Sequence, residues 1–140
     1  MRTLRNTLWL VAASQLMFGL MFVLIPRAAA HGFGLTPVEP GWADWLFVMM
    51  GARFLAFAYG LVLAARDPLR HESWINAMIV VQVIDWVTTL AHLSVHHIAL
   101  PNVASAVVLP VLIVAALLRW HPRRVLRAAP DVPSPVPAGR

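Results

Sequence analysis

Residues 42–65 read WADWLFVMMGARFLAFAYGLVLAA, and Asp44 and Arg53 are the only charged side chains in this stretch. About 20 mostly apolar residues are enough for an α-helix to cross the hydrocarbon core of a bilayer. The apolar residues form a continuous run and do not follow the spaced pattern of an amphipathic surface helix. The stretch therefore predicts a transmembrane helix.

Three further apolar runs have a similar length. They cover about 8–25, 74–96 and 101–118. Of the 140 residues, 60% are hydrophobic and 12% are charged, and the mean hydropathy is +0.73. A soluble domain carries charge on roughly a quarter of its residues, because water must wet its surface. The sequence therefore predicts an all-α integral membrane bundle of four helices within residues 1–127.

The end of the chain has a different composition. Residues 128–140 read AAPDVPSPVPAGR and contain too few apolar residues to bury against a bundle. Closely spaced prolines favour an extended, polyproline-like backbone. We therefore expect a separate, proline-rich tail on the cytoplasmic side. Such tails are usually disordered, and the alternative is that a neighbouring subunit holds it in place.

Two residues give local signals about the helices. Ser73 directly precedes the third apolar run and is a residue type that commonly caps a helix N-terminus. Pro110 lies in the middle of the fourth run. Because proline has no backbone N–H, we expect a free carbonyl one turn before it and a bend in that helix.

The arginines indicate how the helices are oriented. Short cytoplasmic loops of membrane proteins are enriched in Arg and Lys. Arg27 is the only basic residue between the first and second runs, and residues 97–100 contain none. The other flanking arginines lie on the opposite side, at positions 2, 5, 66, 70, 119, 123, 124 and 127. We therefore predict that both termini are cytoplasmic, in a multi-pass protein of the bacterial cytoplasmic membrane.

Arg53 and Asp85 lie near the middle of the second and third runs. A charge at that depth costs about 2.5–3.5 kcal/mol on insertion scales, so it needs a partner. The two residues have opposite charges at matching depth on consecutive antiparallel helices, which predicts an ion pair. Gln15 lies at a similar depth in the first run, on the face of Gly19, and Gly60 shares the face of Arg53. Small residues on these faces favour close helix packing.

The third run contains a polar stripe, which we define as Gln82, Asp85, Thr89, His92 and His96. The steps of three and four residues place these side chains on one helix face. Lipid cannot satisfy such a face, so we expect it to line the bundle interior or a wet cavity. It is either a structural network with Arg53, which we favour, or a path or pocket for a proton, ion or polar ligand.

Histidines near the predicted outer side are candidate metal ligands. His92 and His96 are one helical turn apart, and His31 lies on the same side. Two imidazoles at that spacing can share a zinc or copper ion. The alternative is that these histidines lie at the membrane interface without a metal. Haem is a further alternative, with His31 and His92 as the axial residues.

Several functional classes are excluded or disfavoured by composition. All eleven basic residues are arginine, and the chain contains no cysteine. The absence of lysine excludes a Schiff-base cofactor, and the absence of cysteine excludes thiolate metal sites and disulfides. No face combines basic and aromatic residues as nucleic-acid recognition requires. No nucleophile–base pair or phosphate-binding glycine loop is present, and no cofactor is required.

The first two runs resemble the DoxX-like group of small four-helix bacterial membrane proteins. The residues that carry the resemblance are Gly19 with Pro26, the GARF sequence at 51–54, the Tyr-Gly pair at 59–60, and the ARDP sequence at 65–68. The resemblance implies a left-handed four-helix bundle that is often an accessory subunit and sometimes linked to quinone-dependent oxidation. It assigns no catalytic residue, and the polar stripe and the tail depart from the group.

The sequence favours a non-catalytic accessory or assembly subunit of a larger, bioenergetic membrane complex. Its expected partners are the lipid bilayer together with other membrane subunits or further copies of the chain. The main alternative is a protein that binds a small molecule, a quinone or an ion. Its pocket would contain Gln15, Arg53, Gln82, Asp85 and His92. A metal- or haem-dependent oxidoreductase is a third hypothesis, so enzymatic activity stays open.

Overall fold

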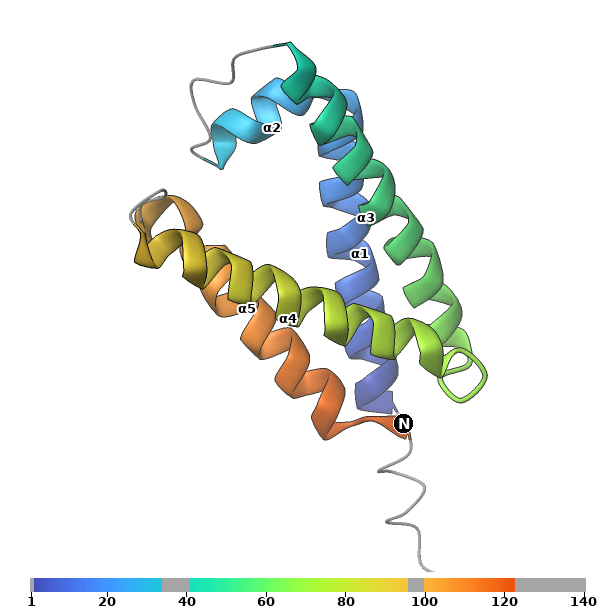
Figure 1. Ribbon diagram of the computed structural model, residues 1–140. Coiled ribbons are helices and arrows are strands. Elements are labelled where there is room, and N and C mark those ends of the chain that lie inside the picture. The colour runs from blue at the N-terminus through green and yellow to red at the C-terminus, as the bar shows by residue number, and fades with distance from the viewer. Residues whose placement is uncertain (1, 34–40, 96–99, 123–140) are drawn as a thin grey trace, which may run out of the picture.

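The computed structural model describes residues 2–33, 41–95 and 100–122, together with the backbone but not the side chains of 101 and 102. These residues form helices and connecting turns and contain no strand. The helices are α1 (Arg2–Leu24), α2 (Pro26–Gly32), α3 (Trp42–Arg66), α4 (Glu72–Ser94) and α5 (Leu100–Arg119) (Figure 1). The prediction of an all-α protein is confirmed.

Three of these helices are long and apolar enough to cross a bilayer, namely α1, α3 and α4. They have 23, 25 and 23 residues, and each contains an 18-residue stretch that is strongly hydrophobic and has at most two charged residues. Helix α5 has 20 residues, and the part of it with described side chains that is counted as apolar is Val103–Arg119. The chain therefore has the features of a membrane protein with three candidate spans, and the fourth span stays a prediction.

The helices match the predicted apolar runs closely, with two differences. Helix α4 begins at Glu72, and no side chain caps its N-terminus. The prediction that Ser73 caps it is therefore wrong, because Ser73 lies inside the first turn. Pro26 does end α1, but it also begins the short helix α2, which the sequence analysis did not predict. Proline is favoured at the first position of a helix, where its missing N–H has no partner to lose.

The four long helices form two hairpins, α1 with α3 and α4 with α5 (Figure 1). The hairpins meet near the N-terminus of the chain and diverge toward the end that carries α2. We call the end where the hairpins meet the joined end. A hydrophobic core lies there and contains buried side chains from all four long helices. Its members are Leu4, Leu8, Val11, Ala12, Leu61, Ala64, Ala65, Ile75, Met78 and Leu117.

Polar contacts also connect helix termini at the joined end. The guanidinium Nε of Arg5 donates a hydrogen bond to the carbonyl oxygen of Ala65, 3.0 Å away. This bond satisfies one of the last carbonyls of α3, which have no partner within the helix. The ring nitrogen Nε2 of His121, beyond the end of α5, lies 3.0 Å from the side-chain amide oxygen of Asn76 in α4. The two bonds fix the start of α1 against α3 and the end of α5 against α4.

Helices α1 and α3 pack closely because glycines face each other. A Cβ added to Gly51 would lie 2.9 Å from the backbone oxygen of Gly19 and 2.8 Å from Val23 Cγ2. A Cβ on Gly19 would in turn lie 2.7 Å from Leu55 Cδ2. Neither position has room for a side chain, so the backbones of the two helices are in direct contact. Small residues serve this purpose at helix interfaces in membranes.

An aromatic cluster closes the same hairpin near α2. Its ring centroids are 5.7–6.1 Å apart, which is typical of stabilising aromatic pairs. The cluster consists of Phe18, Phe22, Phe33, Phe47 and Phe54. Arg27 of α2 also forms an exposed ion pair with Asp44 of α3, with 2.9 Å between Nε and Oδ2. The α1–α3 hairpin is therefore closed at both ends.

Candidate functional site

Arg53 and Asp85 do not form the predicted ion pair. Both residues are exposed, and the ion pairs of the described residues are Arg27–Asp44 and His121–Glu72. Neither side chain of the predicted pair forms a hydrogen bond to another described residue either. The expectation of an Arg53–Asp85 clamp within the chain is therefore wrong for this structure.

The divergence of the two hairpins explains why the pair is missing. Arg53 lies seven residues before Gly60, where the ring of Trp74 packs against α3. Asp85 lies seven residues after Met78, which belongs to the core. A step of seven residues is about two helical turns along one face. Both charges are therefore on the faces that meet at the joined end, but at positions where the hairpins have separated.

The two glutamines of the predicted network are buried. Gln15 in α1 is 6% exposed and Gln82 in α4 is 8% exposed. The amide nitrogen of Gln82 donates to the sulfur of Met78 at 3.5 Å, a long contact to a weak acceptor. Gln15 has no hydrogen bond to another described residue. Burial of these amides is as predicted, but a continuous network that joins them to Arg53 and Asp85 is not present among the described residues.

The remainder of the polar stripe is only partly enclosed. Thr89 is half-buried, and its hydroxyl donates to the backbone oxygen of Asp85 in its own helix at 2.7 Å. His92 is exposed. His96 lies outside the described residues. The described part of the stripe is therefore not enclosed within the bundle along its whole length, and the alternative of a wet cavity stays a prediction.

The predicted metal site is not tested by the structure. His31 is exposed on α2, and His92 is exposed near the end of α4. The described residues contain no group of three or more histidine, aspartate or glutamate side chains that would hold a metal ion. Because His96 is outside the described residues, the set of His31, His92 and His96 stays a prediction.

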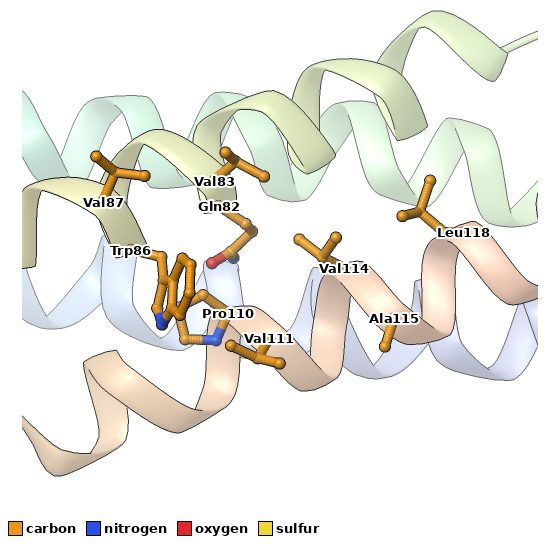
Figure 2. A pocket seen from close by; sticks show the side chains of 9 residues that line it. All are labelled: Gln82, Val83, Trp86, Val87, Pro110, Val111, Val114, Ala115 and Leu118. Carbon is orange, nitrogen blue, oxygen red and sulfur yellow. The ribbon is translucent and has the colours of Figure 1, made fainter. Parts of the chain in front are cut away.

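A groove lies between α4 and α5, with a volume of about 360 Å³ (Figure 2). Gln82 is the one polar side chain among the residues that line it, apart from the indole of Trp86. The other lining residues are apolar: Val83, Val87, Pro110, Val111, Val114, Ala115 and Leu118. Figure 2 shows the amide of Gln82 between the two helices, above Pro110 and beside Trp86. Of the predicted polar residues, Gln82 is thus part of a cavity of ligand size.

Trp86 holds the two helices together at the groove. Its indole Nε1–H donates to the backbone oxygen of Val107, 3.0 Å away. Val107 lies three residues before Pro110, in the turn where the proline interrupts the ladder of backbone hydrogen bonds. A side chain of the neighbouring helix therefore binds at the interrupted turn. Because proline has no N–H, Pro110 frees the carbonyl of Ala106, four residues before it, so Trp86 binds the carbonyl next to the predicted free one.

Sequence reasoning missed Trp86 as a member of the site. The available signal was its position, because it is the tryptophan farthest from the ends of the predicted spans. Tryptophan is usually concentrated at membrane interfaces. Trp86 instead lies in the middle of α4, and Pro110 lies in the middle of α5. A tryptophan and a proline at matching depth on consecutive helices were the available signal, but the contact itself also requires the packing of α4 against α5.

Comparison with known proteins does not identify a family: no protein-family model, no curated protein and no solved structure matches the chain. The resemblance to DoxX-like proteins therefore stays a prediction based on residues of the first two apolar runs.

Proposed function

We propose that the chain is a small bacterial membrane protein of four spans that serves as a non-catalytic subunit of a larger membrane complex. In this proposal both termini and the α3–α4 turn lie in the cytoplasm. The arginine distribution supports this orientation, because arginines 2, 5, 66, 70 and 119 flank the joined end of the hairpins. The fourth span is α5, whose apolar residues continue to Arg119.

The exposed state of Arg53 and Asp85 is the observation that carries the proposal. Each is exposed near the middle of an apolar helix and has no ion-pair partner among the described residues. An unpaired charge facing lipid at that depth is unfavourable by several kcal/mol. A second subunit with complementary polar groups would remove that cost. The two charges therefore favour a protein partner over lipid on this side.

The low burial of the helices supports the same proposal. In the most apolar 18-residue stretches of α3 and α4, 22% and 17% of the residues are buried within the chain. The other residues of each stretch face lipid or another subunit. A small residue, Ala56, lies exposed on the Arg53 face one turn after the arginine. Such residues permit close approach of a further helix.

Co-purification of the full chain in a mild detergent tests the proposal. We expect the native protein to bring down larger membrane subunits in fixed proportion, and Asp85→Asn or Arg53→Gln to lose them. Asp44→Asn is the matched control, because Asp44 is an acidic residue of the same fold whose partner Arg27 lies in this chain. It should retain the partners. A wild-type chain that purifies alone as a monomer would contradict the proposal.

A charge exchange separates a partner subunit from closure of the two hairpins on each other. The double variant Arg53→Asp, Asp85→Arg preserves an internal pair but reverses the charges presented to another protein. We expect this variant to lose the partners as the single variants do. Recovery of wild-type behaviour would mean that the two residues pair with each other, or with further copies of the chain, and the mass of the complex would distinguish these cases.

The tail at 128–140 lies outside the described residues, and its role is part of the proposal. We expect that deletion of these residues weakens co-purification, since an extended proline-rich segment can bind a neighbouring subunit at low entropic cost. The deletion should leave the helical content of the bundle unchanged by circular dichroism.

A further inference from the structure

The carbonyl oxygen of Gln82 accepts no hydrogen bond from a described residue, although the residue as a whole is only 8% exposed. The thioether of Met78 only accepts hydrogen bonds, so the amide nitrogen of Gln82 faces it and the oxygen points elsewhere. That oxygen has no hydrogen bond to any described residue. No side-chain nitrogen or oxygen in the described part of the chain is both fully enclosed and without a partner. The oxygen of Gln82 therefore keeps some exposed surface, and Gln82 is one of the residues that line the groove.

The surroundings of that oxygen are apolar and contain no competing donor among the groove residues. The Trp86 N–H is already bound to Val107. Four valines, a leucine, an alanine and Pro110 form the rest of the lining, and none is charged (Figure 2). A volume of about 360 Å³ is within the range of small-molecule sites. The groove thus offers one hydrogen-bond acceptor on an otherwise apolar surface.

The depth of the groove limits which molecules can supply the missing donor. Gln82 lies beside the midpoint of α4, a candidate transmembrane helix. Water is scarce at the middle of a bilayer, and an acyl chain has no donor. An acyl chain can fill the groove but leaves the amide oxygen unsatisfied, which is costly for a buried polar group. A charged molecule would have no counter-charge in the groove.

We propose that the α4–α5 groove binds a neutral, lipid-soluble hydroxyl compound, such as a phenol or a long-chain alcohol. The hydroxyl donates a hydrogen bond to the Gln82 oxygen, and the apolar body of the molecule lies along the valines of α4 and α5. Arg53 and Asp85 do not line this groove, so the argument for the site does not use the proposed partner subunit.

Fluorescence quenching with a matched pair of probes tests the site. The first probe is a 4-alkylphenol with two bromine atoms at the end of its chain, and the second is its methyl ether, which has no donor. Bromine quenches tryptophan fluorescence at short range, and Trp86 lines the groove. With the purified full chain in lipid nanodiscs, we expect saturable quenching by the phenol at a concentration roughly fivefold to tenfold below that of the ether. Trp86→Phe should remove the saturable part.

Gln82→Leu tests the hydrogen bond itself. We expect it to weaken binding of the phenol about fivefold to tenfold and to leave binding of the ether unchanged. Gln15→Leu is the matched control, because Gln15 is equally buried but does not line the groove. It should leave the preference for the phenol intact. Equal binding of phenol and ether by the wild type would overturn the proposal and indicate a groove for acyl chains only.

A second pair of variants keeps the test decisive if Gln82→Leu does not fold. Ala115→Phe places a ring in the groove, whereas Ala104→Phe places the same ring at an exposed site of α5 that does not line it. We expect Ala115→Phe to abolish saturable quenching by both probes and Ala104→Phe to have no effect. Saturable quenching that survives Ala115→Phe would place the probe elsewhere and overturn the proposal.

Discussion

The two hairpins of this protein are packed in opposite ways. In the α1–α3 hairpin, Gly19 and Gly51 bring the helices into backbone contact, and five phenylalanines close the end near α2. In the α4–α5 hairpin, valines and Pro110 face each other and leave a groove. A hydrogen bond from Trp86 to Val107 connects the two helices there. Small residues therefore produce a closed pair of helices, whereas branched residues and an interior proline leave space between them.

The largest expected effect of a single substitution is in the closely packed α1–α3 hairpin. Gly51→Leu places a large side chain against the backbone of Gly19 and should separate α1 from α3. We expect a loss of about 1–3 kcal/mol or more in the free energy of unfolding, as for other overpacked sites. Titration with a denaturing detergent in mixed micelles measures this. Ala52→Leu, one residue further at an exposed position, is the control and should have little effect.

The corresponding change in the open hairpin should be tolerated. Ala115→Leu adds a similar volume to α5, but the side chain enters the groove. We expect the free energy of unfolding to change by less than about 0.5 kcal/mol in the same titration, as for surface substitutions. A loss comparable to that of Gly51→Leu would mean that α4 and α5 are in close contact in the membrane and would remove the contrast between the hairpins.

An intermediate effect is expected at the Trp86–Val107 hydrogen bond of the α4–α5 hairpin. Trp86→Phe retains an aromatic ring but removes the hydrogen bond to Val107. Interhelical hydrogen bonds in membrane proteins contribute about 0.6 kcal/mol on average and at most about 2 kcal/mol. We expect a loss in that range, measured in the same titration. Trp9→Phe, at an exposed position of α1, should be neutral by comparison.

A similarly small effect is expected at the ion pair that joins α2 to α3. Arg27 and Asp44 are 61% and 35% exposed at their side chains, so water and salt weaken their attraction. Asp44→Asn should reduce the free energy of unfolding by no more than about 0.5 kcal/mol. A larger loss that persists in high salt would show that this ion pair stabilises the hairpin more than exposed ion pairs usually do.

The sequence predicted the helices better than the contacts between them. The second run, predicted at 42–65, is the helix Trp42–Arg66, and the polar residues Gln15 and Gln82 are buried as expected. Arg53 and Asp85 were predicted to pair because their charges are opposite and they lie at matching depth on consecutive antiparallel helices. Those properties are fixed along each helix, but a contact also requires the angle between the hairpins, which depends on side-chain volumes at the joined end.

The sequence by itself determined the helical class, the approximate ends of the long helices and the face on which each polar residue lies. These properties follow from local hydrophobicity and from the helical repeat, which neighbouring helices do not change. Only the tertiary structure decided that the hairpins diverge, that Trp86 binds Val107, and that Gln82 lies in a groove. The physical reason is that helix packing in a membrane depends on the fit of side chains on different helices, such as Gly60 with Trp74.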